Sequence, residues 1–399
     1  MSEDFSNADV RRGHAALRVS RRGDIPSFIV MDVMREAARR EAAGHRVVHM
    51  EVGQPGTPAP RGARSALAAA LEREPLGYTL ALGNWPLRER IARHYQDLHG
   101  LAVAPERVVV TSGSSAAFVL AFLALFDHGA RVALPEPGYP CYRHILTALG
   151  CETLMLETGP ATRWMPNAEQ ILAAPGPLGG LLVASPANPT GTLVEPARLA
   201  AIADACRERG AWLVSDEIYH GLTYGAAATT ALAISDAAVV INSFSKFFSM
   251  TGWRIGWMVV PDHLVRTVER LAQNLYIAPP AASQVAALGA FDSLDELEAN
   301  RQVYAANRSL LLDGLPALGF DRIAPADGAF YLYCDVSGLT RDSLTFTRQM
   351  LDETGVAATP GIDFDAGRGR DFVRFSYAGT TADMAEALER FARWSRLRG

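Results

Sequence analysis

The sequence predicts an α/β protein with a large domain, whose mostly parallel sheet is sandwiched by helices, and a smaller α+β domain. From about Arg61 onward, short β-rich runs alternate with longer helical segments, the pattern of parallel βαβ units. These runs are apolar along nearly their whole length, as expected for strands covered by helices on both faces. After about Ser293 a different order of elements begins, which predicts the second domain.

A helical segment precedes the first strand of the large domain. Apolar residues recur with helical spacing from Pro26 to about Arg46, and turn residues in Gly53–Pro60 end that pattern. The carboxyl ends of the strands that follow should meet at one edge of the sheet and face a binding crevice. The predicted strands are Arg107–Gly113, Arg131–Pro135, Leu181–Pro186, Trp212–Glu217 and Ala238–Ser245.

The last part of the chain predicts the smaller α+β domain. A long charged helix is followed by a strand at Gly328–Val336, a helix, a strand at Asp371–Ala378 and a final helix. We assign residues 1–60 to an N-terminal arm and part of the small domain, and residues 61–293 to the large domain. Residues 294–399 form the remainder of the small domain, so that the N-terminal arm and the C-terminal third together build it.

Composition favours a soluble protein that acts on small molecules. The net charge of −5 offers no general attraction to nucleic acid or to an anionic membrane. No apolar run approaches the roughly 18 residues of a membrane span, and we expect no leader peptide at the N-terminus. The four cysteines show neither a CxxC pair nor metal-ligand spacing with histidine, so we expect no metal and a reducing, cytoplasmic location.

One lysine stands out, because Lys246 is the single lysine among 38 basic residues and the other 37 are arginines (38 − 1 = 37). Arginine replaces lysine in most ion pairs, but its guanidinium stays protonated and cannot attack a carbonyl as a lysine amine can. Lys246 is therefore a candidate to form a Schiff base. The alternative is a surface lysine that escaped a compositional bias, and its neighbours must decide between the two.

Polar residues follow the ends of two predicted strands. Ser114 and Ser115 open a helix directly after a strand, where backbone amides and hydroxyls can bind phosphate, although serines at a helix start are often only N-caps. Asn188 lies in the loop Ser185–Gly191, where its amide can bond a ligand oxygen, although the loop alone is also a common turn.

Two further strand ends carry charged groups. Asp216 ends a very apolar strand, and burial of its carboxylate is costly unless a cation such as a protonated ring nitrogen pairs with it. The alternative is a helix-capping aspartate with Tyr219 as a core aromatic. The segment Ser243–Trp257 places hydroxyls before Lys246 and Arg254 eight positions after it, where the arginine can pair with a phosphate.

Together these strand ends supply what pyridoxal phosphate needs: an amine for its aldehyde, a carboxylate for its pyridine nitrogen, donors for its phenolic oxygen and a cradle for its phosphate. Over nearly its whole length the chain resembles the class I/II aminotransferases of the fold-type-I pyridoxal-phosphate superfamily, which are aspartate aminotransferase-like. The matching segments, in order, are Gly53–Gly56, Tyr78–Ala92, Pro137–Tyr142, Ser185–Gly191, Ser243–Trp257, Gly328–Tyr331, Thr359–Gly361 and Val373–Ala378.

The resemblance implies roles for individual residues. Lys246, Asp216 and Tyr219 would be catalytic, with Lys246 holding the cofactor aldehyde and Asp216 the pyridinium nitrogen. The other cofactor contacts would be Asn188 with Tyr219 at the phenolic oxygen, Tyr139 against the ring, and Gly113, Ser114, Ser115, Ser243, Arg254 and the partner subunit's Tyr78 at the phosphate. The shared Tyr78 would make the enzyme a homodimer.

The resemblance also implies a substrate site and an activity. Arg374 would bind the substrate α-carboxylate as a two-pronged fork beside Asn188 and the backbone of Gly53; the alternative is a surface arginine on a strand. The activity would be transfer of the amino group of an L-amino acid to 2-oxoglutarate or pyruvate by a ping-pong mechanism, in amino-acid metabolism and biosynthesis. Two features depart from the family pattern: Phe247 follows the lysine, and Asn274–Gln284 offers no arginine for a side-chain carboxylate.

Three other functions remain open at this point. A lyase or decarboxylase would use the same cofactor, and donors that yield stable keto acids distinguish it. A ligand-binding or regulatory protein could use the same scaffold, but residues before Pro26 leave no room for a helix-turn-helix module. A nucleotide-binding α/β protein would need a GxGxxG or Walker-type loop at a strand end, and the sequence has none there.

Overall fold

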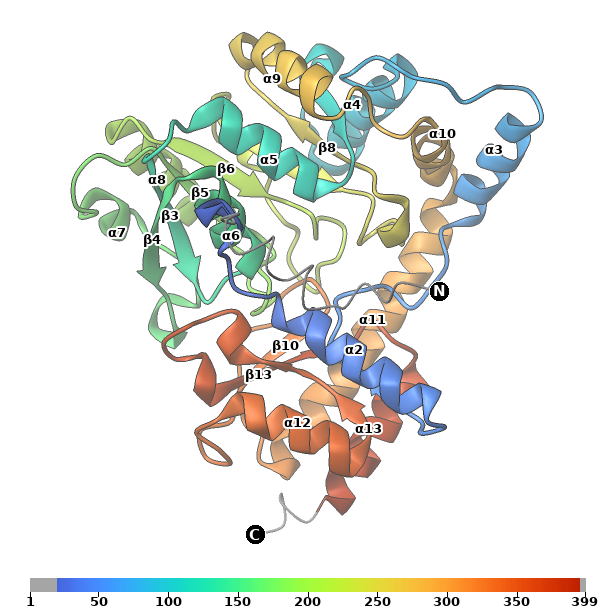
Figure 1. Cartoon of the computed structure of the whole chain (residues 1–399), viewed down its shortest axis with the longest axis vertical. Helices are drawn as coiled ribbons and strands as arrows, with labels where there is room; N and C mark the ends of the chain where they lie inside the picture. The colour runs from blue at the N-terminus through green and yellow to red at the C-terminus, as the bar shows by residue number, and fades with distance from the viewer. Residues whose placement is uncertain (1–19, 395–399) are drawn as a thin grey trace, which may run out of the picture.

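The computed structural model describes residues 20–394 and shows two packed parts (Figure 1). The first 19 residues, for which the sequence predicts no leader peptide, lie outside the described residues. Figure 1 shows the large sheet and its helices in the upper part, and the orange and red C-terminal elements in the lower part with the blue helix α2 against them. Within residues 20–394, no helix combines the length and apolar character needed to cross a membrane.

The upper part is built on a seven-stranded sheet with the order β2-β8-β7-β6-β5-β3-β4. All neighbours pair in parallel except β8, which runs antiparallel to β2 and β7. The five predicted strands are confirmed, and β4 and β8 are additions to the prediction. The strands are β2 (Val108–Thr111), β3 (Arg131–Glu136), β4 (Glu152–Glu157), β5 (Gly180–Ala184), β6 (Trp212–Asp216), β7 (Val239–Ser243) and β8 (Gly256–Val259).

Helices cover both faces of this sheet, as the apolar strands predict. Along β5, Leu181 and Val183 belong to one core cluster and Leu182 to another, because successive side chains point to opposite faces. Helices α4 (Trp85–His99) and α8 (Pro196–Glu208) pack on the first cluster, with α7 (Ala168–Leu172) beside α8. The second cluster is covered by α5 (Ser114–Leu125), α6 (Pro140–Leu149) and α9 (Asp262–Leu275).

The lower part joins the two ends of the chain. Its four-stranded sheet has the order β12-β13-β10-β9, and the N-terminal strand β1 (Val48–His49) pairs in parallel with β11 (Val356–Ala357). Helix α2 (Ile29–Ala42) contacts β11 and β12, so the N-terminal arm packs on C-terminal elements. The other elements are α11 (Leu294–Gly314), β9 (Arg322–Ile323), β10 (Tyr331–Asp335), α12 (Ser343–Thr354), β12 (Thr359–Pro360), β13 (Phe372–Ser376) and α13 (Thr381–Arg393).

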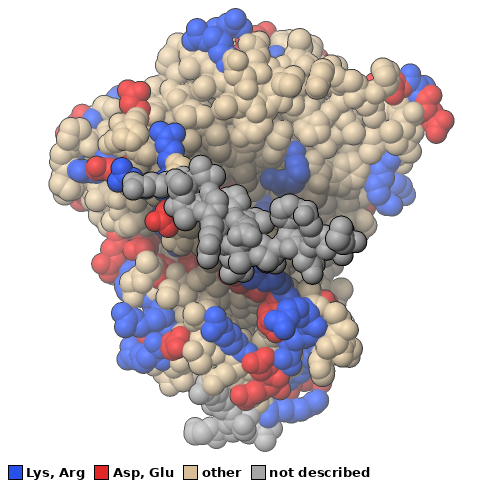
Figure 2. Space-filling model, viewed as in Figure 1, with Lys and Arg blue, Asp and Glu red and all other residues tan. Residues whose placement is uncertain are grey.

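Charged residues of both signs are interspersed on the face shown in Figure 2, most densely over the lower part. Most ion pairs on the surface link arginines to nearby carboxylates, for example Arg46 with Asp383 at 2.6 Å. Such exposed pairs each contribute little to stability. The charges therefore keep the surface hydrated, and the apolar clusters provide the main stabilisation of the fold.

Helices α3 (Arg61–Leu71) and α10 (Ala281–Ala290) pack closely because two glycines face each other. A Cβ at Gly62 would overlap the carbonyl oxygen of Gly289, and the Gly62 amide donates to Ser293 Oγ at 2.8 Å. Ordinary side chains at these positions would force the helices apart. This contact anchors the start of α3, which follows the loop that carries Gly53 into the site.

We expect Gly62→Ala to lower the free energy of unfolding by about 1–2 kcal/mol, because overpacking outweighs the gain in helix propensity. The matched control is Gly338→Ala, since Gly338 lies in a loop with no atom near the added Cβ. Urea unfolding followed by circular dichroism measures both variants. Equal stability of the two variants would contradict the proposed close packing of α3 on α10.

Candidate active site

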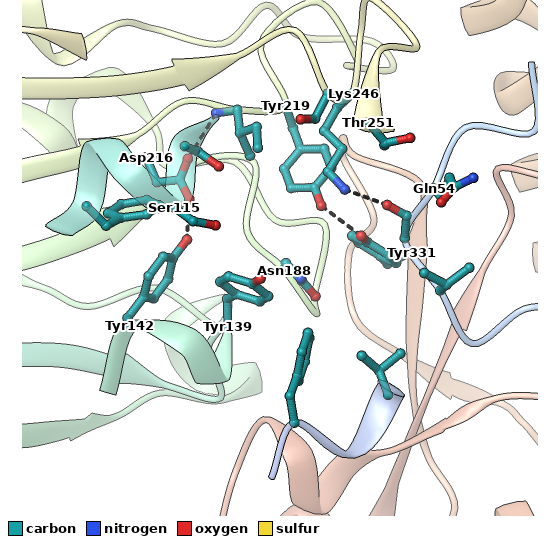
Figure 3. A pocket seen from close by; sticks show the side chains of 18 of the residues that line it. Gln54, Ser115, Tyr139, Tyr142, Asn188, Asp216, Tyr219, Lys246, Thr251 and Tyr331 are labelled. Atoms are coloured by element: carbon teal, nitrogen blue, oxygen red, sulfur yellow. Dashed lines mark hydrogen bonds between the residues drawn. The ribbon is translucent and has the colours of Figure 1, made fainter. Parts of the chain in front are cut away.

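A cavity of about 220 Å³ lies at the carboxyl ends of the parallel strands, where the lower part closes over them. Strand β8 runs in the opposite direction, so its start, just after Arg254, reaches the same edge. Segments far apart in sequence therefore converge there, as the sequence predicts (Figure 3). The predicted residues that line the cavity are Gly53, Ser114, Ser115, Tyr139, Asn188, Asp216, Tyr219, Lys246, Arg254 and Arg374.

Asp216 ends β6 as a buried carboxylate that neutral groups hold in place. The Tyr142 hydroxyl donates to Oδ2, and the Ile218 amide donates to Oδ1 at 3.1 Å (Figure 3). Burial raises the pKa of Asp216 to about 6, although both hydrogen bonds and the charge of Lys246 oppose the rise. The carboxylate is thus poorly compensated by the protein alone and is suited to pair with a cation brought by a ligand.

Lys246 lies in the turn after β7 and reaches into the cavity. Its Nζ donates to the carbonyl oxygen of Gly53, and lies 5.9 Å from the centre of the Tyr219 ring. Burial lowers the pKa of Lys246 to about 7, and the charges of Arg374 and Arg254 act in the same direction. A substantial fraction of the amine is therefore neutral near pH 7, which is the nucleophilic form.

The N-terminus of α5 and Arg254 form an anion cradle. Gly113 precedes the helix with φ +83° and offers no side-chain cap, so the first-turn amides of α5 are free to bind an anion. A Cβ at Gly113 would overlap the guanidinium of Arg254, so only glycine lets the arginine lie against the helix start. Ser114 and Ser115 lie in the first turn, as predicted.

Ser243 does not line the cavity, in contrast to its predicted contact with phosphate. It is 1% exposed, and its Oγ lies 2.8 Å from Ser245 Oγ and 3.0 Å from the Ile255 carbonyl oxygen. The hydroxyl is therefore occupied inside the turn, and Ser245 lines the cavity in its place. Both serines are buried, at 1% and 5% exposed, and the phosphate contact of Ser243 stays a prediction.

Arg374 on β13 is 2% exposed and points into the cavity with its guanidinium held on several sides. Nη1 donates to Asn188 Oδ1 at 2.9 Å, and Nη2 donates to the carbonyl oxygen of Glu51 and lies 3.2 Å from Thr359 Oγ1. Its Nε is buried without a partner. A buried guanidinium with an unused donor fits a carboxylate ligand better than a surface role.

Three residues lie against Lys246 in a fixed arrangement. The hydroxyls of Tyr219 and Tyr331 lie 2.7 Å apart (Figure 3), and burial raises the pKa of Tyr219 well above its usual range. A Cβ at Gly53 would overlap the Tyr331 hydroxyl, so this position requires glycine. Tyr219 therefore stays protonated and able to donate a hydrogen bond. Its contact with the Tyr331 hydroxyl fixes the position of the Tyr219 hydroxyl.

Two residues of the site were not predicted from the sequence: Tyr142, which donates to Asp216, and Tyr331, whose hydroxyl contacts that of Tyr219. Tyr142 follows Tyr139 by three residues at the start of α6, a spacing that places both rings on one helix face. Their ring centres lie 5.2 Å apart, edge to face. This spacing was the sequence feature that could have indicated Tyr142. For Tyr331 the sequence offered only its place in Gly328–Tyr331, a segment that resembles the family.

Tyr78, predicted to reach the phosphate of a partner subunit, lies outside the cavity and is 88% exposed. Its neighbour Thr79 accepts a hydrogen bond from Gln284 Nε2 at 2.9 Å, which places this segment beside residues 275–284. Leu80 and Ile277 are also exposed, at 68% and 54%. Large apolar side chains are therefore exposed in both segments.

Fold and site define a class I/II aminotransferase of the fold-type-I pyridoxal-phosphate superfamily. Residues 46–391 match the family described as aminotransferase class I and II, and the chain belongs to this family. It is therefore an aminotransferase, a class of enzyme that acts on small amino acids and keto acids.

Individual relatives agree with this assignment. The chain is 52% identical over 381 residues to valine–pyruvate aminotransferase of Mycobacterium tuberculosis, across 94% of this chain and 98% of that protein. It is 33% identical to aspartate/prephenate aminotransferase of Thermus thermophilus, across 90% and 94% of the two chains.

Solved structures show the same fold. An aminotransferase from Mycobacterium tuberculosis superposes with a TM-score of 0.93 at 52% identity, across 95% of this chain and 99% of that one. Aspartate aminotransferase from Thermus thermophilus with maleate gives a TM-score of 0.89 at 32% identity, across 94% and 99%. The fold prediction is therefore confirmed.

The pKa of Lys246 predicts a pH dependence of stability in the cofactor-free protein. The folded pKa of about 7 lies below the ordinary value of 10.5, so the unfolded chain binds more protons between these two pH values. The contribution of Lys246 to the free energy of unfolding therefore rises with pH across this window. We expect the free energy of unfolding of the wild type, measured with urea, to exceed that of Lys246→Met by a margin that grows from pH 7 toward pH 10.5. A flat difference would show that the amine is not desolvated.

Proposed function

We propose that this chain is a pyridoxal-phosphate-dependent aminotransferase that moves the amino group of an uncharged aliphatic L-amino acid to pyruvate. One observation carries the proposal: a lysine amine and a buried, poorly compensated carboxylate face one cavity that also holds an anion cradle and a buried arginine fork. These groups meet the separate needs of one cofactor and one amino-acid substrate. The family of the chain and its 52% identical relative support the same function.

The residues present fit the cofactor. The phosphate would lie at the start of α5, with Ser114, Ser115, Ser245 and Arg254 around it, where Gly113 leaves room for the guanidinium. Lys246 would hold the aldehyde. Asp216 would face the ring nitrogen, Asn188 and Tyr219 the phenolic oxygen, and Tyr139 the face of the ring.

When bound, the cofactor supplies an electron sink for the bond that breaks at the substrate Cα. Asp216 would accept a hydrogen bond from the ring nitrogen and keep it protonated, and the paired cation would keep the carboxylate ionised. Arg374 binds the α-carboxylate and fixes the direction of the Cα–H bond. Lys246, once its amine is free, takes the proton from Cα, since a pKa of about 7 leaves a neutral fraction.

A single site for both substrates sets the order of events. Donor and acceptor both carry an α-carboxylate, and Arg374 is the buried fork in the cavity that can bind it. The first 2-oxo acid must therefore leave before the second 2-oxo acid binds. This order is ping-pong, and the same residues serve both half-reactions.

The lining of the cavity supports an aliphatic substrate and pyruvate. The cationic side chains that line it are Lys246, Arg254 and Arg374, and each already has a role with cofactor or α-carboxylate. Among the described residues no further lining cation remains for a second carboxylate, as in aspartate or 2-oxoglutarate. Phe28, Val30 and other apolar residues occupy the wall instead. The name of the Mycobacterium tuberculosis relative, with valine and pyruvate, supports this choice.

We further propose a homodimer with shared sites. The exposed surface of Tyr78, Leu80 and Ile277 would bury against a second copy, and the hydroxyl of the partner subunit's Tyr78 would complete the phosphate cradle. A cytoplasmic location and a part in amino-acid biosynthesis agree with such substrates. Within residues 20–394 the four cysteines are all free, which suits a reducing compartment.

The visible spectrum of the purified protein tests the cofactor. We expect a visible absorbance band from a protein-bound pyridoxal Schiff base, which borohydride fixes on Lys246. Lys246→Ala should keep phosphate binding but lose transamination by at least about 10⁴-fold, because it removes both the attachment and the proton carrier. Reduced label on any residue other than Lys246, or near wild-type turnover of the alanine variant, would refute the mechanism.

Steady-state kinetics tests the substrates. We expect valine to transfer its amino group to pyruvate with kcat/KM at least about tenfold above that for 2-oxoglutarate, because a buried unpaired carboxylate costs more than this factor. Aspartate should be a correspondingly poor donor. Preference for 2-oxoglutarate with aspartate would show that a cation from elsewhere completes the site, and would overturn the proposed substrate class.

A further inference from the structure

The wall of the cavity opposite the strand ends comes from the N-terminal helix. Phe28, Val30 and Met31, which we call the α2 roof, belong to the N-cap and first turn of α2 and line the cavity. The Phe28 ring lies 5.6 Å from the Tyr139 ring, edge to face. Val30 is 3% exposed. The roof is apolar and lines the same cavity as Arg374.

The first turn of α2 has no cap of its own. Phe28 occupies the N-cap position and has no polar side chain, so the backbone amides of the first turn need partners from elsewhere. Asp363 supplies them: Oδ1 accepts from the Ile29 amide and Oδ2 from the Val30 amide, both at 3.2 Å. One carboxylate, 334 residues away in sequence, therefore caps the helix that carries the roof.

Asp363 is itself held by a residue of the upper part. Arg143 on α6 donates to the Asp363 carbonyl oxygen at 2.7 Å, and Asp363 is 2% exposed. Burial raises the pKa of Asp363, while the two amides and the charges of Arg374 and Arg143 oppose the rise. Because Tyr139 is the N-cap residue of α6, the α2 roof and the proposed ring-stacking tyrosine are both linked to this helix.

The same segment also holds the carboxylate-binding arginine. Thr359 Oγ1 lies 3.2 Å from Arg374 Nη2, and the Phe364 ring lies 4.7 Å from the Arg374 guanidinium. Asp363 is adjacent to Phe364. Residues 359–364 therefore contact both Arg374 and the first turn of α2.

Resting on the proposed function, we propose that Asp363 is a positioning residue for the substrate side chain: it holds the α2 roof at a fixed distance from Arg374, so that the site favours a branched aliphatic amino acid such as valine over a smaller one such as alanine. Asp363 touches neither cofactor nor substrate. Its effect passes through the backbone amides of Ile29 and Val30.

The test compares valine and alanine as donors for the holoenzyme with Asp363→Ala. We expect the ratio of kcat/KM for valine over alanine to fall about tenfold, because a loose roof forfeits the packing of the extra methyl groups. The loss should appear in the KM for valine, with kcat at saturation changed less than about threefold. Hydrogen exchange of the full chain should show faster exchange at residues 29–33 in the variant.

Two controls keep the result specific. Asp342 caps α12 by accepting from the Thr345 amide at 3.1 Å, and no residue of α12 lines the cavity, so Asp342→Ala removes a similar cap without touching the roof. It should leave the valine-to-alanine ratio unchanged. Val30→Ala should lower the ratio by itself, and Asp363→Ala should then add little, since both act through the same roof.

An unchanged ratio and unchanged exchange in Asp363→Ala would overturn the inference while leaving the aminotransferase assignment intact. Equal losses with valine and alanine would also overturn it, because they would indicate a general structural role. A wild type that transaminates no aliphatic donor would instead overturn the proposed substrates, and the role of Asp363 in selecting them with it. If Asp363→Ala fails to fold, Asp363→Asn, which keeps one carbonyl acceptor, must show a smaller fall in the same ratio.

Discussion

The buried carboxylate of Asp216 is the constraint on which the rest of the site depends. Its hydrogen-bond donors, Tyr142 and the Ile218 amide, are neutral, and burial raises its pKa to about 6. Burial of an ionised carboxylate lowers the stability of a folded protein unless a cation pairs with it. Its position at the end of β6 places that cation where the cavity opens, and Lys246, with its pKa lowered to about 7, lies in the same cavity. An amine whose pKa burial lowers and a carboxylate whose pKa burial raises, both in one cavity, are typical of a site for proton transfer.

The sheet topology explains why so many distant residues meet. Five parallel strands end at one edge and deliver the loops with Ser114, Tyr139, Asn188, Asp216 and Lys246. The antiparallel strand β8 then starts at that edge, so Arg254 arrives from the opposite chain direction and closes the anion cradle. The lower part contributes the substrate end of the cavity. The N-terminal arm pairs with C-terminal strands, and this pairing brings the Glu51 carbonyl and the α2 roof to Arg374.

Where the sequence prediction succeeded, the signal was local. The apolar strands could be recognised because each is a short run between turn residues, and the candidate residues followed directly after those runs. β4 was missed because its residues are only partly buried and its run ETLMLE carries acidic ends. β8 was missed because it follows the lysine turn so closely. The site was predicted less completely where a role depends on a contact between segments, as for Tyr142 and Tyr331. The domain boundaries and the assigned roles of single residues stay predictions.

The sequence by itself determined the family and the enzyme class of this protein, because ordered family segments can be recognised without knowing any long-range contact. The tertiary structure decided what those segments leave open. It placed Ser245 rather than Ser243 in the lining of the cavity, because the Ser243 hydroxyl makes its hydrogen bonds within the turn. It also placed Asp363 on the first turn of α2, a contact that spans almost the whole chain. No periodicity or motif encodes such a contact, because it exists only once the two ends of the chain have packed together.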